Sequence, residues 1–140
     1  MACGCDHSTL ETCPQCDFEP FVRNHFFTGK LMGAADKRAH LWENSKRLHA
    51  GLKQLGFTLG TDEPQSAIIA VIMPELQTGA AMWEALLDEG LYVNLARPPA
   101  TPAGMTLLRC SLCSEHSSAQ VDEILGMFRA AGQATGCIPA

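Results

Sequence analysis

Three stretches of the chain place apolar side chains at the spacing of an amphipathic α-helix. The first covers residues 36–55 and is followed by Gly56, where a glycine commonly ends a helix. The second runs from residue 76 to Gly90, and the third follows Ser117, whose spacing to Gln120 is that of a capping box. The apolar positions expected to face the core are Leu41, Trp42, Leu48, Leu52 and Leu55 in the first helix, Leu76, Ala80, Trp83 and Leu87 in the second, and Val121, Ile124, Leu125 and Phe128 in the third.

Four shorter stretches have the composition of β-strands. Residues 57–59 are a short candidate, and residues 66–73 form an apolar run with a proline near each end, which is typical of a buried strand. Residues 91–96 and 105–112 flank a proline-rich turn. The predicted order is helix, strand, strand, helix, strand, strand, helix. This order predicts an α+β fold in which a small antiparallel sheet is covered by helices on one side.

The proline-rich turn separates two arginines, Arg97 and Arg109. Its sequence, PPATPAG, contains prolines that fix φ and a glycine that permits a tight reversal, so we expect the turn to be stiff. Arginine presents a planar fork that matches a carboxylate through two hydrogen bonds, so this arrangement suggests a site for a small carboxylic acid. The spacing alone also fits the alternative that both arginines are solvated charges at strand ends.

Length and composition limit the classes of protein to consider. With 140 residues, 46% of them hydrophobic, and a net charge of −5, the chain is long enough for one packed domain. No apolar run approaches the ~20 residues that span a bilayer, and the N-terminus lacks the pattern of a signal peptide, so we expect a cytoplasmic protein. The mild negative charge argues against nucleic-acid binding. The basic residues of the first helix fit a solvated face: Lys37, Arg38, Lys46, Arg47 and Lys53.

Four of the seven cysteines lie close to the N-terminus: Cys3, Cys5, Cys13 and Cys16. Zinc accepts four thiolates in a tetrahedron, and such closely spaced pairs are how small zinc knuckles supply them. A disordered, thiol-rich tail is the alternative that this spacing leaves open.

Cys110 and Cys113 form another closely spaced pair, which we interpret differently. Along a strand, Leu108 and Cys110 share one face while Arg109 and Ser111 share the other. Cys110 is therefore expected to be a small buried residue and not a metal ligand.

The segments RPPATPAG and LRCSLCSEH, which run from Arg97 to Gly104 and from Leu108 to His116, resemble the C-terminal small domain of the α-oxoamine synthases. These enzymes depend on pyridoxal phosphate and condense an amino acid with an acyl-CoA. Within the family, LWENSKRLHAGLKQLGF and MWEALLDEGLYVNLARPPATPAG are most similar to the bacterial serine palmitoyltransferase branch. Other branches usually carry an additional arginine where this chain has Leu107. The resemblance covers about Arg38 to Gly136.

The resemblance implies a division of roles in the complete enzyme. Arg109 would be the fixed partner of the amino-acid carboxylate, and Arg97 the more mobile one on the turn. The reaction of that branch joins L-serine to palmitoyl-CoA, giving 3-ketodihydrosphingosine in sphingolipid biosynthesis, with loss of carbon dioxide and CoA. No lysine of the chain lies in a sequence like the family's cofactor-lysine motif. The resemblance therefore implies that the chain is not active alone and needs a large domain or synthase subunit that binds pyridoxal phosphate, with a homodimer as the complete enzyme.

The predicted organisation has three parts. Residues 1–36 are a cysteine-rich, aromatic N-terminal segment that matches nothing in the synthases, residues 37–136 are the synthase-like small domain, and residues 137–140 are a tail. His116, next to the start of the last helix, is expected to make local hydrogen bonds. The alternative function is a zinc-stabilised protein-interaction module without catalytic activity.

Overall fold

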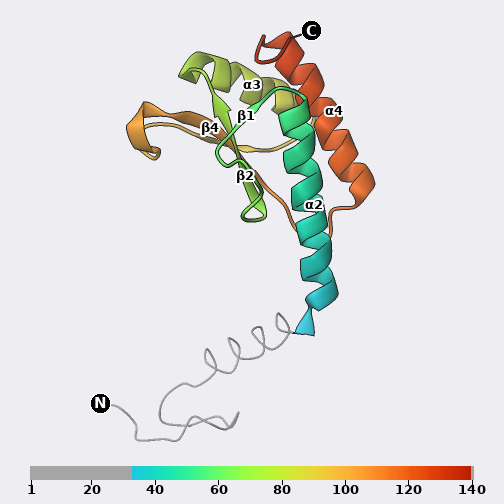
Figure 1. Ribbon diagram of the computed structural model, residues 1–140. Helices are drawn as coiled ribbons and strands as arrows, with labels where there is room; N and C mark the ends of the chain where they lie inside the picture. The colour runs from blue at the N-terminus through green and yellow to red at the C-terminus, as the bar shows by residue number, and fades with distance from the viewer. Residues whose placement is uncertain (1–32, 140) are drawn as a thin grey trace, which may run out of the picture. The chain divides into compact units, whose positions relative to one another are not determined.

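The computed structural model describes residues 33–139 (Figure 1). This part of the chain has the predicted α+β fold, and its helices and strands follow one another in the predicted order. The elements belong to a compact unit that spans Lys37–Ala140. Their bounds are α2 (Ala35–Gln54), β1 (Thr58–Leu59), β2 (Ile68–Met73), α3 (Leu76–Asp88), β3 (Asn94–Ala96), the 3₁₀ turn η1 (Pro102–Gly104), β4 (Thr106–Ser111) and α4 (Ser118–Ala134).

The sheet has four strands in the order β1-β2-β4-β3, and every neighbouring pair is antiparallel. The central strands β2 and β4 pair along their whole length. In the middle of this pairing, Ala70 of β2 lies opposite Arg109 of β4, and Asn94 of β3 lies opposite Arg109 on its other side. The proline-rich turn joins the edge strand β3 to β4, as the sequence predicts.

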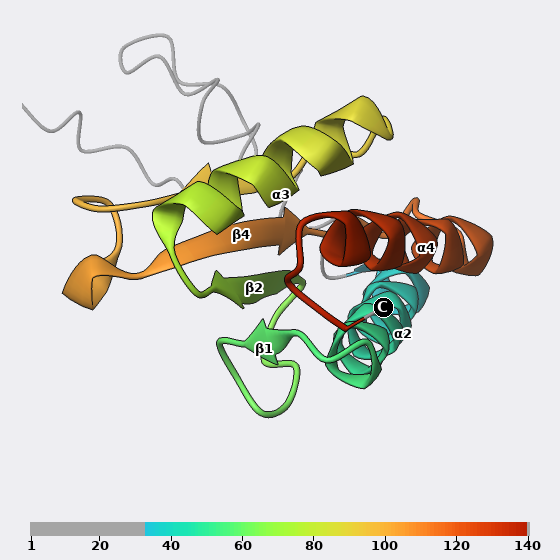
Figure 2. The same ribbon diagram turned by 90° about the horizontal axis from the view of Figure 1, so that it is seen from above.

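One face of the sheet packs against the three helices and forms the core. Figure 2 shows α3 alongside β4, with α4 and α2 beside it. Side chains alternate along each strand, so every second residue of β2 and β4 points into this core. The buried residues are Ile69, Val71 and Met73 of β2 and Thr106, Leu108 and Cys110 of β4.

The opposite face of the sheet is exposed or half-exposed, and we call it the open face. The described helices pack on the core side, so residues of the open face are covered mainly by neighbouring strand residues. It comprises Thr58 of β1, Ile68, Ala70 and Ile72 of β2, Asn94 and Ala96 of β3, and Leu107, Arg109 and Ser111 of β4.

The buried side of α2 contains polar residues that the apolar spacing did not predict. Asn44, Ser45 and His49 are at most 4% exposed, whereas Trp42, assigned to the core, is 43% exposed. The Ser45 hydroxyl donates to the Ser66 carbonyl (2.7 Å), and His49 Nε2 lies 2.9 Å from the Thr61 carbonyl oxygen. Carbonyl groups of the loop between β1 and β2 thus satisfy Ser45 and His49, so the burial of these two polar side chains costs little. The helix was predicted correctly, but part of its core face was wrong.

Part of the core face predicted for α3 was also wrong, although the helix is present and Trp83 packs against the core. Its buried residues are Gly79, Met82 and Leu86, while Leu76 and Leu87 are 42% and 44% exposed. The reason is a close approach at Gly79. A Cβ atom there would lie 2.7 Å from Thr106 Cγ2, which is too close for two carbon atoms. The helix therefore turns its glycine, and not its leucines at either end, toward the sheet.

The last helix agrees with the prediction. Ser117 caps α4 in a capping box, accepting a hydrogen bond from the Gln120 amide while Gln120 Oε1 accepts one from the Ser117 amide. Phe128 of α4 is fully buried and meets Phe57 edge-to-face, with ring centroids 5.7 Å apart.

The predicted strand over residues 91–96 is partly wrong, because only Asn94–Ala96 pairs with β4. Leu91 instead takes part in the C-terminal cap of α3. Gly90 has a positive φ of 88°, and the Leu91 amide donates to the Leu86 carbonyl. Within residues 33–139 no helix is both long enough and apolar enough to cross a membrane.

Candidate functional site on the open face

Arg109 stands on the open face of the central strand β4. Cys110 and Leu108 on either side of it are buried, so strand alternation turns the guanidinium away from the core. Arg109 is exposed, and within residues 33–139 its side chain makes no hydrogen bond or ion pair. An arginine in the middle of a sheet thus keeps all its donors available for a ligand or another polypeptide.

The β2 side of Arg109 carries very small side chains. Ala70 lies directly opposite, and the next position across the sheet is Gly60, whose amide donates to the Ala70 carbonyl (2.9 Å). A Cβ atom on Gly60 would lie 3.1 Å from the Ala70 Cβ, so both positions belong to the open face. Space is therefore available beside the guanidinium on this side.

Arg97 occupies a different place from Arg109. It follows the last residue of β3, and it lines a hollow of about 770 Å³ formed by the end of β2, the start of α3 and the proline-rich turn. Arg97 lies three residues beyond Asn94, which faces Arg109, and this corresponds to about 10 Å along the strand. The structure does not bring the two predicted arginines into one pocket. A joint carboxylate clamp therefore remains a prediction that requires Arg97 to move.

The turn that carries Arg97 has internal hydrogen bonds. The Ala100 amide donates to the Arg97 carbonyl (2.9 Å), and the Thr101 hydroxyl donates to the Met105 carbonyl (2.5 Å). The Arg97 side chain itself is exposed, and within the described part of the chain it has no hydrogen bond or ion pair. The backbone of the turn is thus restrained while the guanidinium can change position.

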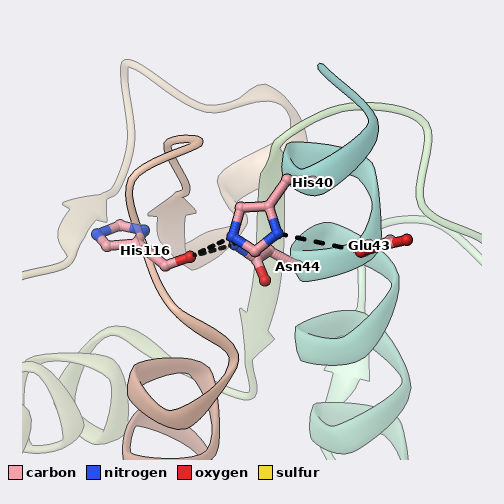
Figure 3. Close-up of polar contacts among 4 residues, drawn as sticks. All are labelled: His40, Glu43, Asn44 and His116. Atoms are coloured by element: carbon pink, nitrogen blue, oxygen red, sulfur yellow. Dashed lines mark hydrogen bonds and ion pairs between the residues drawn. The ribbon is translucent and has the colours of Figure 1, made fainter. Parts of the chain in front are cut away.

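His116 has a local structural role, as expected (Figure 3). Its ring Nδ1 accepts a hydrogen bond from the Cys113 amide (3.3 Å). Its carbonyl oxygen lies 2.9 Å from His40 Nε2 and accepts a hydrogen bond from Asn44 Nδ2 (2.6 Å). A carbonyl only accepts, so His40 must carry its proton on Nε2 to complete the first bond. These contacts hold α2 against the segment between β4 and α4.

Two ion pairs reinforce the same junction from the solvent side. Lys37 pairs with Glu115 (2.7 Å). The hydrogen bond and the opposite charge raise the pKa of Lys37 and lower the pKa of Glu115. Arg47 binds both carboxylate oxygens of Asp122 in α4 (2.7 and 2.6 Å), and this hydrogen bonding lowers the pKa of Asp122. These partners support the interpretation of the basic residues of α2 as a solvated helix face.

The cysteines divide into described and undescribed positions. Cys110 is buried as predicted, and burial raises the pKa of its thiol to about 12, so it stays protonated at neutral pH. No group of three or more metal-ligating side chains comes together in residues 33–139. The candidate ligands Cys3, Cys5, Cys13 and Cys16 lie outside the described residues, so the zinc site remains a prediction.

The described lysines do not fit a covalent site for pyridoxal phosphate near Arg109. Lys37, Lys46 and Lys53 all lie on α2, which packs on the other side of the sheet. Lys37 pairs with Glu115, and Lys53 donates to the Asp62 carbonyl (3.3 Å). The chemistry that depends on that cofactor therefore needs residues other than these.

Comparison with known proteins assigns the chain to a family. Residues 29–128 match the family described as aminotransferase class I and II. This chain belongs to that family. It is 60% identical over 109 residues to the serine palmitoyltransferase of Sphingomonas paucimobilis, a match that covers 78% of this chain and 26% of the relative. It is 39% identical over 109 residues to the serine palmitoyltransferase of Caulobacter vibrioides.

Solved structures give the same assignment within the aminotransferase class I and II family. Serine palmitoyltransferase from Sphingomonas wittichii is 66% identical, with a TM-score of 0.77 over 79% of this chain and 28% of that one. A lysine-to-alanine variant of serine palmitoyltransferase from Sphingomonas paucimobilis, solved with a bound PLP–myriocin aldimine, is 60% identical, with a TM-score of 0.76 over 78% of this chain and 27% of that one. The resemblance inferred from the sequence is thus confirmed. The chain spans about a quarter of the length of the curated relatives it matches.

Sequence reasoning missed the neighbours of Arg109. Asn94, Ala70 and Gly60 lie beside it only because β2 and β3 pair with β4 in this particular register. Alternation along β4 separated Arg109 from Cys110 correctly, but it carries no information about which residues of other strands lie opposite.

Proposed function

We propose that this chain forms part of a serine palmitoyltransferase-like enzyme, in which its open face binds the carboxylate of the amino-acid substrate. The observation that carries this proposal is Arg109, exposed and unpaired at the centre of the sheet. The high identity to serine palmitoyltransferases supports L-serine and a long-chain acyl-CoA as the substrates.

Arg109 suits this role because a strand in the middle of a sheet holds its backbone still. Its planar guanidinium can form two parallel, charge-assisted hydrogen bonds with a carboxylate, which fixes the orientation of the amino acid as well as its position. Arg97 has an exposed side chain without a described partner, on a turn whose backbone is restrained by hydrogen bonds. In our proposal Arg97 moves toward the same carboxylate later in the reaction.

The remainder of the active site would come from a complementary large domain or subunit. Pyridoxal phosphate acts as an electron sink for amino-acid substrates when it is bound. Since the described lysines do not fit its covalent site, we propose that residues of the large domain hold the cofactor, that the open face lies against that domain, and that the residues of this chain are inactive alone. The complete enzyme in this proposal is a homodimer.

A hybrid enzyme tests the role of Arg109. Residues 38–139 of this chain replace the matching region of the Sphingomonas paucimobilis enzyme, with which the chain is 60% identical, and we expect the hybrid to be active. In the hybrid, Arg109→Ala should lower kcat/KM for L-serine. The loss of transition-state stabilisation should be about 2–4 kcal/mol, because the substitution removes a charge-assisted, bidentate contact. Arg109→Lys should restore only part of the loss, since an ammonium group lacks the planar fork. Steady-state kinetics with varied L-serine provide the measurement.

Arg129→Ala is the matched control, because Arg129 is an exposed arginine of α4 with no described partner. It should leave the kinetics unchanged. Unaltered serine kinetics in the Arg109→Ala hybrid would contradict the proposed function and leave Arg109 as a solvated charge.

Arg97→Ala should reduce kcat more than it weakens serine binding, because a contact formed late stabilises the transition state more than the bound substrate.

A further inference from the structure

Asn94 is the polar side chain that the sheet places directly beside Arg109. It begins the edge strand β3, and its Cα partner in β4 is Arg109. Residues opposite each other in an antiparallel pair have Cβ atoms about 4.5–5.5 Å apart and on the same face. Asn94 is exposed like Arg109, and within residues 33–139 its side chain makes no hydrogen bond either. Two side chains with N–H donors thus stand next to each other, and neither has a hydrogen-bond partner among the described residues.

The other neighbours of Arg109 on the open face do not offer an equivalent donor. Across β2 are only the methyl group of Ala70 and, beyond it, Gly60. Along β4 itself, Leu107 is apolar, and Ser111 is two residues away, at about 6.6 Å. The polar environment of the guanidinium is therefore one-sided, toward β3.

A carboxylate has lone pairs for both residues. Its two oxygens accept about four hydrogen bonds, and a bidentate contact with a guanidinium uses two of them. The side-chain amide of asparagine has two N–H donors on Nδ2, so it can donate to an oxygen that Arg109 already holds. The amide also carries no charge, so it leaves the guanidinium free to pair with the ligand.

We propose that Asn94 is a second residue that binds the substrate carboxylate, with its Nδ2 group donating to an oxygen of the carboxylate held by Arg109. This inference rests on the proposed function of Arg109 and extends it to the edge strand. The neutral amide is essential to the arrangement. A carboxylate at position 94 would pair with Arg109 and compete with the substrate for the fork.

The first test measures the placement of the two residues in the full 140-residue chain. Asn94→Asp introduces a carboxyl group whose pKa, followed by NMR titration, should lie about 0.5–1 unit below that of a control carboxyl group, because a cation lies directly opposite. The control is Thr58→Asp, on the same face but two strands from β4 and about 12 Å from Arg109, where salt screens the interaction. Adding Arg109→Ala should abolish the difference. Equal pKa values for the two introduced groups would overturn the proposal.

The second test measures the ligand contact in the hybrid enzyme described above. The dissociation constant for L-serine, followed through the cofactor's absorbance, should rise about 10- to 150-fold in Asn94→Ala, the loss expected for one hydrogen bond to a charged group. Asn94→Asp should weaken serine binding further, and Arg129→Ala, an exposed position of α4, should have no effect.

The outcomes separate this inference from the function on which it rests. If Arg109→Ala weakens serine binding and Asn94→Ala does not, Asn94 is not a carboxylate ligand while the role of Arg109 stands. If neither substitution changes serine binding, the proposed function fails with it.

Discussion

At the scale of single residues, Arg109 conflicts with its local structure. Ala70 and Asn94 lie opposite it, and neither they nor any other described residue gives it an acidic partner. β-Branched residues fit a half-exposed, pleated surface better than an unpaired charge does. A position that favours binding over stability is common in functional sites, where the best residue for folding is not the best for the ligand.

This conflict predicts that Arg109→Thr stabilises the chain while it removes the proposed contact. The free energy of unfolding in urea should rise by about 0.5 kcal/mol, because threonine has the higher β-propensity. Ser111→Thr, on the same face two residues away, is the matched control. It should give a similar gain without changing the charge. A marked loss of stability in Arg109→Thr alone would mean that the arginine stem contributes packing to the open face.

At the scale of elements, the junction between α3 and the sheet depends on Gly79. A Cβ atom there would lie 2.7 Å from Thr106 Cγ2 and 3.2 Å from Met73 Cγ, in a region where both neighbours are buried. Thr106 is β-branched and stiff, so it cannot move aside easily. The helix consequently keeps a glycine in its interior, where glycine costs about 1 kcal/mol relative to alanine.

Two glycine substitutions should therefore act in opposite directions. Gly79→Ala should lower the free energy of unfolding by about 1–3 kcal/mol, because overpacking outweighs the gain in helix propensity. Gly126→Ala in α4, where no atom lies within 4 Å of the added carbon, should raise it by up to about 1 kcal/mol. Chemical denaturation measures the free energy of unfolding of both variants. Stabilisation by Gly79→Ala would show that the helix can shift away from the sheet.

The ion pair between Arg47 of α2 and Asp122 of α4 adds a pH dependence. Hydrogen bonding to Arg47 lowers the pKa of Asp122 in the folded chain. The stabilisation is thus complete above the carboxyl's unfolded pKa of about 3.9 and is lost as the pH falls through the lower folded value. In Arg47→Ala this contribution should disappear, so stability should fall less between pH 5 and pH 2 than in the wild type. The control is Arg129→Ala, whose stability should depend on pH as in the wild type. The same pH dependence in Arg47→Ala would show that the ion pair contributes nothing to stability.

These elements also show how far the sequence could predict the fold. Apolar periodicity, Gly56 and the capping box at Ser117 predicted the helices and their order, because those signals are local. The buried faces of α2 and α3 were partly missed, since the acceptors of Asn44 and His49 and the contact at Gly79 come from distant segments. The same limit applies to the site. A motif singled out Arg109, but its neighbour Asn94 depends on strand register.

At the scale of the whole molecule, the described helices cover only one face of the sheet, and the open face is available for contact with a partner. A sheet with helices on one face and Ile68, Ile72, Leu107 and Arg109 on the other exposes apolar area around a charge. Such a surface is typical of a contact with another domain. The match to about a quarter of the length of serine palmitoyltransferases supports our proposal that this partner is a large domain.

This arrangement predicts how the 140-residue chain behaves toward pyridoxal phosphate on its own. Incubation with the cofactor followed by borohydride should label none of Lys37, Lys46 and Lys53 preferentially, because all three lie on the solvent side of α2 and away from Arg109. Peptide mass mapping measures the distribution of the label. The active hybrid is the control, in which one lysine outside the grafted residues should carry the label. Stoichiometric labelling of one lysine in the isolated chain would contradict the division of roles, since the cofactor site would then lie within this chain.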